Sequence, residues 1–375
     1  MPFTIERVAS REKLNRFVDL PFRLYRDDPN WVPPVKYLQR QLLDRSKHPF
    51  HRHADVEYFL ARDGEGTVRG RVASIVNHAH NEYHDEKTGF FGFMEMENDL
   101  RLTRCLLEAC QKELEAAGME RIRGPMNFST NEECGLLVKG FDGPPLIMMP
   151  YNPPWYEDLL EGSGFAPIKD LYAYSLRSSL AVDSRMSRVA DMVRRRSSAV
   201  LRDISRKRIH QEVPLIMDIY NECWRDNWGF VPMTKEELDM MADELKMIMV
   251  PRMAPIVEVD GEPVAFAVSL PDANQAFKRA GGSLLKAILA LKVPFFRVNI
   301  DRSRVLLLGV RNAYRGRGFE ALLIDRIIKS NVEQGVIWGE LSWILDDNLS
   351  MRRILERDLK ADQYRTYRIF QKDVQ

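Results

Sequence analysis

Two arginines and two glycines alternate at residues 315–318, in a stretch that could hold a charged ligand. Residues 305–310, just before it, are apolar apart from one glycine, as in a buried strand. From Phe319 onward, apolar residues recur at helical spacing. Glycines let the backbone approach a ligand closely, and the N–H groups of a first helical turn attract anions. This strand, loop and helix therefore predict a site for a phosphate-bearing ligand.

The loop resembles the central motif of the GNAT N-acyltransferase superfamily, Arg/Gln-x-x-Gly-x-Gly/Ala, which binds the diphosphate of acyl-coenzyme A. Arg315 and Gly318 match its first and fourth positions, whereas Glu320 stands where the motif has Gly or Ala. The Glu320 carboxylate would repel phosphate if it pointed inward, and would stabilise the helix start if it pointed away. The resemblance implies acetyl-CoA or another acyl-CoA as co-substrate, bound by Leu308, Gly309, Val310, Arg315, Gly316, Arg317, Gly318, Phe319 and Asn348.

The resemblance extends along the whole chain. Residues 80–83, 89–93, 124–127 and 151–153 are similar to segments of a bacterial group of tandem GNAT-like proteins of about this size. Membership implies an α/β fold of two GNAT-like halves, each with a mixed, mostly antiparallel central sheet flanked by helices.

The order of the predicted elements repeats along the chain. Both halves read β-α-α-β-β-β-α-β-α-β, and we expect domains at residues 1–178 and 196–375. In the first half, residues 97–99 (Glu-Asn-Asp) stand in place of a glycine loop, and acidic groups there repel a diphosphate. The sequence therefore predicts one acyl-CoA site, in the second domain, and a structural or acceptor-binding role for the first. Residues 78–89 are expected to form a polar hairpin.

In GNAT enzymes the acyl thioester lies between two diverging strands, where the acceptor amine attacks it. The resemblance implies a backbone donor for the oxyanion near Gly309 or Val310, and a base that deprotonates the amine. Glu340, in a predicted strand at residues 336–345, is the best-placed carboxylate. An ion pair with a nearby arginine would explain Glu340 equally well.

The acid that protonates the departing thiolate is harder to assign. GNAT enzymes often carry a tyrosine seven residues after the asparagine that Asn348 matches, and here that position is Leu355. Tyr364 or Tyr367, in the last predicted strand, could replace it, although aromatic residues in strands more often serve packing. Release of the thiolate directly to water is a further alternative.

A polar loop at residues 127–133 is the predicted contact with the acceptor. Asn127, Asn131 and Glu132 are its candidate substrate-binding residues, although a turn-rich connection explains them almost as well.

The histidine clusters at residues 48–53 and 78–84 are better explained as surface groups than as zinc ligands, so no metal site is expected. The basic residues at 185–208 lack interleaved aromatics and predict a solvated face rather than a nucleic-acid site.

Composition agrees with an ordinary globular protein. The 375 residues are 45% hydrophobic and 29% charged, with a net charge of +1, so neither disorder nor a polyanionic partner is indicated. Four cysteines without CxxC spacing favour reduced thiols and a cytoplasmic setting. No signal-like or membrane-spanning apolar run is found in the sequence.

An insertion at residues 272–298 separates a predicted hairpin, with its turn at Asp260-Gly261, from the cofactor strand at residues 305–310. It combines a leucine-rich helix with five basic residues, a glycine pair and Phe295-Phe296. Core packing explains the leucines alone; the other features favour a mobile lid or a surface for an apolar acceptor or a long acyl chain.

These observations predict an acyl-CoA-dependent N-acyltransferase that moves an acetyl or longer acyl group to the amine of a small molecule or peptide. Two alternatives stay open: a non-catalytic ligand-binding or scaffold protein with a degenerate motif, and an aminoacyl-tRNA-dependent peptidyltransferase. A homodimer is compatible with the sequence.

Overall fold

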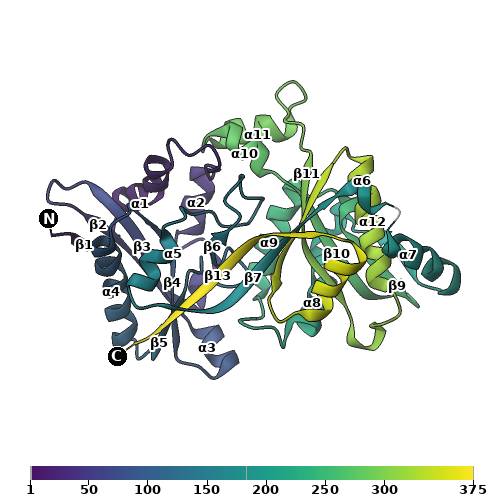
Figure 1. Cartoon of the computed structure of the whole chain (residues 1–375), viewed down its shortest axis with the longest axis horizontal. Helices are drawn as coiled ribbons and strands as arrows, with labels where there is room; N and C mark the ends of the chain where they lie inside the picture. Colours follow the sequence, from purple (N-terminus) through teal and green to yellow (C-terminus); the bar gives the residue numbers. More distant parts are fainter. Residues whose placement is uncertain (1, 183, 375) are drawn as a thin grey trace. The chain divides into compact units, whose positions relative to one another are not determined.

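The computed structural model describes residues 2–182 and 184–374, which form two compact units. Unit 1 comprises Met1–Asp170, Ala276–Arg297 and Thr366–Gln375, and unit 2 comprises Leu171–Gln275 and Val298–Arg365. Each is a mixed, mostly antiparallel sheet flanked by helices (Figure 1), which confirms the predicted fold class.

Unit 1 contains the elements of the first half and two later segments. Its helices are α1 (Arg11–Leu24), α2 (Lys36–Leu42), α3 (His78–His84), α4 (Leu100–Ala116), α5 (Tyr156–Gly162) and α11 (Leu284–Lys292). Its strands are β1 (Thr4–Arg7), β2 (Ala54–Arg62), β3 (Val68–Asn77), β4 (Thr88–Met96), β5 (Arg121–Gly124), β6 (Leu136–Lys139) and most of β13 (Asp362–Asp373).

The sheet of unit 1 has the order β1-β2-β3-β4-β5-β13, with β6 also paired to β13. The β4–β5 pair is parallel, and the other strand pairs described in this unit are antiparallel. Helix α4 packs on β2, β3 and β4 through its apolar stripe, which includes Leu106 and Leu114, both fully buried. The expected hairpin at residues 78–89 is wrong. Residues 78–84 instead form α3, which is capped by Asn77 because its side chain accepts a hydrogen bond from the backbone N–H of His80, and β4 begins at Thr88.

Unit 2 contains the elements of the second half. Its helices are α6 (Ser178–Ala181), α7 (Arg185–Arg196), α8 (Ile209–Trp224), α9 (Lys235–Ile248), α12 (Phe319–Glu333) and α13 (Leu349–Arg353), and α10 (Asn274–Ala280) begins in this unit and ends in unit 1. Its strands are most of β7 (Ala166–Arg177), β8 (Val200–Asp203), β9 (Pro255–Val259), β10 (Glu262–Pro271), β11 (Arg302–Val310) and β12 (Trp338–Leu345).

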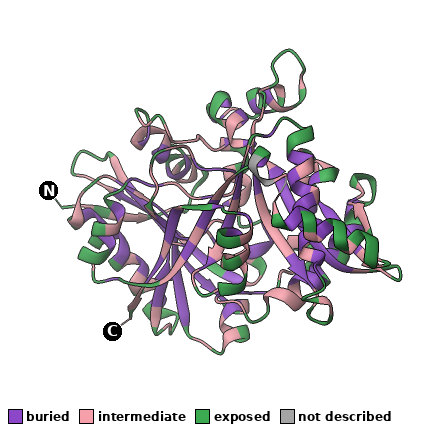
Figure 2. Cartoon of the chain, turned by 45° about the vertical axis from the view of Figure 1, so that its right-hand side comes forward, coloured by how far each residue is buried: buried purple, intermediate pink, exposed green. Residues whose placement is uncertain are grey.

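The sheet of unit 2 has the order β7-β12-β11-β10-β9-β8, and among the described residues only β11 and β12 pair in parallel within it. Helix α12 covers it, and the buried residues of α12 and the strands form one core (Figure 2). Helix α7, in the expected linker, packs on α12. Burial alone would raise the pKa of Asp325, but hydrogen bonds from Arg194, Lys329 and Ser187 outweigh it and hold that pKa below its usual value.

The two units exchange their closing strands. β7, the last strand of the first half in sequence, pairs with β12 in unit 2, and β13, the last strand of the chain, pairs with β5 in unit 1. The observed units therefore differ from the expected domains 1–178 and 196–375 at residues 171–178, 276–297 and 366–375.

Candidate active site

The parallel strands β11 and β12 of unit 2 separate partway along their length. Their register runs from Arg302 opposite Trp338 to Val305 opposite Leu341, and β11 then continues to Val310 and β12 to Leu345. On its other side β11 contains a bulge, because Val305 and Leu307 have successive partners in β10 and Leu306 is the extra residue. A bulge redirects side chains and backbone groups locally, and such bulges are common beside active sites.

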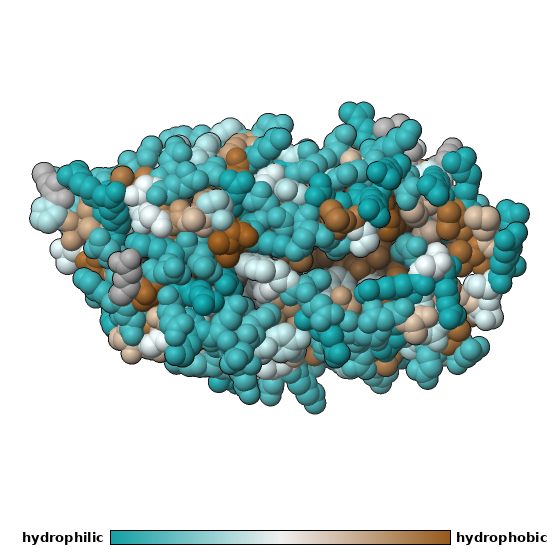
Figure 3. Space-filling view, turned by 60° about the horizontal axis from the view of Figure 1, so that its bottom comes forward, coloured by the Kyte–Doolittle hydropathy of each residue, from teal (hydrophilic) through white to brown (hydrophobic). Residues whose placement is uncertain are grey.

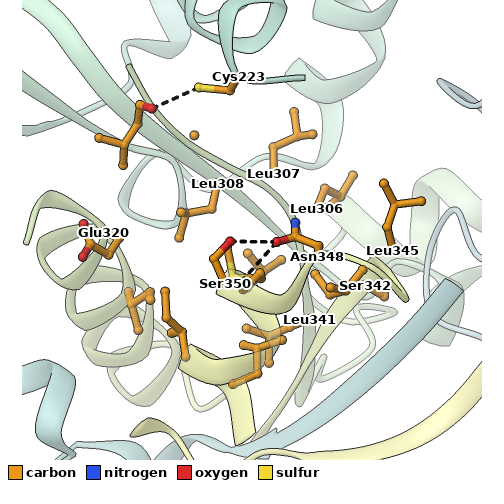
Figure 4. A pocket seen from close by; sticks show the side chains of 18 of the residues that line it. Cys223, Leu306, Leu307, Leu308, Glu320, Leu341, Ser342, Leu345, Asn348 and Ser350 are labelled. Carbon is orange, nitrogen blue, oxygen red and sulfur yellow. Dashed lines mark hydrogen bonds between the residues drawn. The ribbon is translucent and has the colours of Figure 1, made fainter. Parts of the chain in front are cut away.

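A cavity of about 720 Å³ opens in unit 2 where the two strands separate. This volume lies within the range of about 300–1,000 Å³ that small-molecule sites occupy. Its wall is mostly apolar (Figure 4) and includes Leu306, Leu307, Leu308, Leu341, Ile344 and Leu345. On the face turned forward in Figure 3, the surface is hollowed and apolar residues form the floor of the hollow.

The glycine loop lies at one end of this cavity. Gly316 and Gly318 have φ angles of 75° and 81°, in the left-handed region that favours glycine, and α12 begins directly after Gly318. A Cβ at Gly316 would meet no atom within 4 Å, whereas a Cβ at Gly318 would lie 2.8 Å from a methyl group of Val193. Gly316 therefore leaves space for a ligand, and Gly318 allows α7 to pack closely.

Glu222 of α8 fixes the start of the loop. Its carboxylate accepts hydrogen bonds from the guanidinium of Arg311 at 2.8 Å and from the backbone N–H of Asn312 at 2.7 Å. Burial acts to raise the pKa of Glu222, but these two bonds and the nearby charge of Arg315 outweigh it and lower that pKa. An ionised carboxylate thus orders the backbone that leads into the glycine loop.

The residues predicted to bind the cofactor fall into two groups. The cavity wall includes Leu308, Gly309, Val310, Arg315, Gly316 and Asn348. The other three predicted residues, Arg317, Gly318 and Phe319, lie in the glycine loop and at the start of α12. From there, only backbone groups or a mobile side chain could reach a ligand. The Arg317 guanidinium lies over the ring of Tyr314 at 4.9 Å, Gly318 packs on α7, and the Phe319 side chain is buried in the core.

Glu320 and Asn348 both line the cavity, Glu320 at the start of α12 and Asn348 at the start of α13. Glu320 is in the first turn of α12, and Figure 4 shows its carboxylate turned away from Leu307 and Leu308. Asn348 caps α13, because its side-chain oxygen accepts hydrogen bonds from the N–H of Met351 at 3.1 Å and the hydroxyl of Ser350 at 3.2 Å.

The predicted base, Glu340, is fully buried within a polar network of unit 2. Its carboxylate accepts hydrogen bonds from the hydroxyls of Ser342 and Tyr364, and the Nε of Arg304 lies 3.8 Å from it. Ser342 itself lines the cavity and accepts a hydrogen bond from Arg304 at 2.8 Å. Glu340 is therefore paired with an arginine, and Ser342 lies between its carboxylate and the cavity; the role of Glu340 as a base stays a prediction.

The other predicted residues lie in unit 1. Tyr367 is fully buried, in the part of β13 that pairs with β6. Asn127 accepts a hydrogen bond from the N–H of Phe93 at 2.7 Å and donates one to Glu133 at 3.2 Å, so it holds the backbone of β4. Asn131 and Glu132 belong to the same loop, where their N–H groups bond to Ser129.

Sequence reasoning missed the contribution of α8 and the turn after it. Cys223, Trp224, Asn227 and Trp228 line the cavity. The Cys223 thiol donates a hydrogen bond to the carbonyl of Val310 at 3.2 Å, and burial raises its pKa. The two tryptophans and the asparagine within six residues, 223–228, were the available signal, because such a cluster is unusual on a solvated helix end.

The histidine cluster near residue 50 belongs to the packing of unit 1. The rings of Phe50 and Phe128 stack at 4.7 Å, the rings of His48 and His51 both contact Phe128, and burial lowers the pKa of His51 to about 4. Within residues 2–182 and 184–374, no group of three or more His, Cys, Asp or Glu side chains is placed to hold a metal ion. None of the helices in these ranges has the length and apolar character that a membrane span requires.

Solved structures share this fold over the whole chain. A tandem GNAT protein from the clavulanic acid biosynthesis pathway superposes with a TM-score of 0.60 over 100% of this chain and 99% of its own, at 11% identity. A GCN5-related N-acetyltransferase from Sphaerobacter thermophilus gives a TM-score of 0.54 over 100% and 96%, at 12% identity. The fold is thus that of the tandem GNAT proteins.

Two relatives are close enough in sequence to define the family. The protein called YghO from Escherichia coli (strain K12) is 34% identical, covering 99% of this chain and 95% of its own length. The bacterial ceramide synthase of Caulobacter vibrioides is 32% identical, covering 97% and 96%. No family model matches the chain. The chain belongs to the GNAT N-acyltransferase superfamily, in the bacterial tandem group that contains these two relatives, and by class it is an N-acyltransferase.

Proposed function

We propose that this enzyme transfers a long acyl group from acyl-CoA to the primary amine of a long-chain amino alcohol. The observation that carries the proposal is the cavity between the separated ends of β11 and β12, which joins a glycine loop to a predominantly apolar wall. A relative that is 32% identical over almost its whole length is named a ceramide synthase, and a ceramide is an N-acylated long-chain amino alcohol.

The chemistry of the loop fits a diphosphate. Gly316 leaves open space beside the cavity, Arg315 supplies positive charge, and the first turn of α12 directs N–H groups to the loop. Glu320 opposes this charge, so its carboxylate lowers the affinity without removing the site. The pantetheine arm would run along Leu308, Gly309 and Val310.

The apolar wall favours a long acyl chain over acetyl. An acetyl group needs a pocket for only one methyl group. The cavity wall formed by β12 is larger and includes Leu341, Ile344 and Leu345, together with Leu355 from the segment after α13. Each methylene removed from water contributes about 0.8 kcal/mol, so affinity for acyl-CoA should rise with chain length until the wall is filled.

The polar network of Glu340 supplies the proton transfers. The amine nitrogen attacks the thioester carbon, and backbone N–H groups at the β11 bulge stabilise the oxyanion. The amine proton passes to the oxygen of Ser342 while Ser342 gives its own proton to Glu340. The carbon–sulfur bond then breaks, and the same proton returns through Ser342 to the departing thiolate. Tyr364 and Arg304 hold the carboxylate in place.

A thiol-release assay tests the proposal. The full-length protein is incubated with acyl-CoA of increasing chain length and with either a long-chain amino alcohol or a lysine-containing peptide, and products are identified by mass spectrometry. The expected result is an amide product with long acyl chains and the amino alcohol. Faster transfer with acetyl-CoA, or with the peptide, would contradict the proposed substrates; no heat of binding with any acyl-CoA would contradict the donor.

A further inference from the structure

Helix α11 packs with its small residues inward and its large apolar residues outward. Ala287 and Ala290 are 2% and 4% exposed, whereas Leu285 and Ile288 are 68% and 45% exposed. Ala287 packs in a small cluster with Val35 and Ala280 of the same unit. A helix that contributed to a core would direct its larger side chains toward that core. The outward apolar face of α11 is therefore available to contact another apolar surface.

The loop after α11 continues this apolar surface. Phe295 is 91% exposed and Phe296 is 47% exposed, and their rings contact each other edge to face at 5.2 Å. Figure 1 shows the loop extending from the end of α11, and Figure 2 colours most of it as exposed. We call the exposed side chains of Leu284, Leu285, Ile288, Phe295 and Phe296 the α11 face.

The charge around the α11 face has one sign. Residues 273–300 contain five basic side chains, Lys278, Arg279, Lys286, Lys292 and Arg297, and no acidic one. The whole chain has a net charge of only +1, so positive charge is concentrated in this segment. All five basic residues are exposed.

The α11 face is fixed to unit 1 and does not hang from a flexible linker. The N–H of Lys36 donates to the carbonyl of Gly282 at 3.0 Å, and a Cβ at Gly282 would lie 2.6 Å from the ring of Phe22. Ser283 caps the helix by accepting from the N–H of Lys286. Close packing at Gly282 therefore sets the direction in which the face points.

We propose that the α11 face binds the surface of a membrane that contains anionic lipids. Exposed leucine and phenylalanine side chains beside lysine and arginine are the composition that inserts into the headgroup region, where apolar groups reach the acyl chains and basic groups contact phosphate. A second copy of the chain is a weaker match, because a two-fold contact through this face would bring five positive charges against five. The inference extends the proposed function, since a long-chain amino alcohol and its acylated product both reside in membranes.

Co-sedimentation with lipid vesicles tests the proposal on the full-length protein without substrates. Vesicles of phosphatidylcholine with about one third phosphatidylglycerol should bind the protein, and vesicles of phosphatidylcholine alone should bind it much more weakly. The double variant Leu285→Ser/Phe295→Ser should lower the partition coefficient at least about tenfold. Lys286→Gln/Lys292→Gln should lower it about fivefold for each charge, and added salt should abolish the difference.

The matched control removes apolar side chains from another exposed site. Ile337 and Val332 in unit 2 are 63% and 47% exposed, so Ile337→Ser/Val332→Ser changes a similar apolar area outside the α11 face. Equal loss of binding in this control, or no sedimentation of the wild type, would overturn the proposal. Concentration-dependent dimers that Leu285→Ser/Phe295→Ser dissolves would assign the face to a second copy instead. Gly316→Val should retain vesicle binding, so failure of the proposed acyl-CoA site is distinguishable from failure of this one.

Discussion

The hydroxyl of Tyr364 donates a hydrogen bond to the carboxylate of Glu340, which is inaccessible to solvent. The hydroxyl of Ser342 donates to the same carboxylate and lies in the cavity wall. Ser342 therefore joins a buried base to the place where an amine would react, and it offers a way to interrupt proton transfer without removing the charge of Glu340.

Replacement of Ser342 by alanine should lower kcat about a hundredfold, because it removes the connection between the cavity and Glu340. The affinity for CoA should change little. The two lost hydrogen bonds, to the Glu340 carboxylate and from the Arg304 guanidinium, involve charged groups and should together cost about 3 kcal/mol of unfolding free energy. Ser350→Ala is the control, because Ser350 also lines the cavity but bonds to Asn348. Equal kcat in the two variants, measured at saturating substrates, would remove Ser342 from the proton path.

Replacement of Gly316 by valine should abolish CoA binding in calorimetric titration, because the new side chain would enter the open space beside the loop. A valine at a φ of 75° should also cost about 1–3 kcal/mol of stability. Gly335→Val is the matched control. Gly335 has a φ of 74° and open space around its Cβ position, but it lies after the C-terminal end of α12, away from the loop. Similar CoA affinities in the two variants would argue against a phosphate cradle at the loop.

Replacement of Glu320 by glutamine should tighten CoA binding about threefold at low salt, because it removes a negative charge from the helix turn beside the diphosphate site. The change should also cost about 0.3–1 kcal/mol of stability, since a carboxylate at a helix start interacts favourably with the dipole. Titrations at low and high salt measure the first effect. An affinity that is unchanged or weaker would show that Glu320 serves only the helix.

Glu95 in unit 1 should make stability depend on pH. Burial raises its pKa to about 7, even though Arg71 and the hydroxyls of Tyr25 and Tyr156 act to lower it. Between its ordinary value of 4.5 and about 7, the folded protein holds one proton more than the unfolded chain, so stability falls as pH rises through this window. Relative to Glu95→Gln, the wild type should lose about 3 kcal/mol from pH 4.5 to 7.

Urea unfolding of both proteins at several pH values measures this difference. His51, which is partly buried, and His80, which is buried, have pKa values that desolvation lowers to about 4, and they titrate in the same window with the opposite sign. They are present in both proteins, so their effect cancels in the comparison. Parallel stability profiles for the wild type and Glu95→Gln would contradict the expected titration.

A new charge should affect the stability of the protein very differently at two adjacent residues of α11. Ile288→Asp should leave the melting temperature nearly unchanged, because this side chain is 45% exposed. Ala287→Asp should cost several kcal/mol, because Ala287 is 2% exposed and packs against unit 1. Thermal denaturation of the pair tests whether α11 packs as described, and a large loss in Ile288→Asp would make it an ordinary core helix.

Local patterns in the sequence predicted the elements that carry the site. The apolar run before the glycine loop is β11, and the helical spacing after Phe319 is α12. The hairpin across Asp260 and Gly261 also forms, because both residues adopt positive φ. These features depend on neighbours in sequence, which is why a single chain was sufficient to predict them.

Contacts between residues that are far apart in the sequence could not be predicted from local patterns. An alternating strand pattern identifies β7 and β13 as strands, but it does not say which sheet each one joins. The wall formed by Trp224 and Trp228 depends on how α8 packs, and the network around Glu340 of β12 depends on Arg304 of β11 and Tyr364 of β13. The helix α3 was missed because its polar residues are typical of a turn, and its cap, Asn77, is also the last residue of β3.

The exchange of β7 and β13 has a consequence for biosynthesis. The ribosome makes β5, at residues 121–124, long before its partner β13, at residues 362–373. In that interval the nascent chain exposes two open sheet edges, one at β5 and the other on the β7 segment that awaits β12. Open edges pair readily with other chains, so the order of synthesis leaves β5 open to such pairing until β13 has been made.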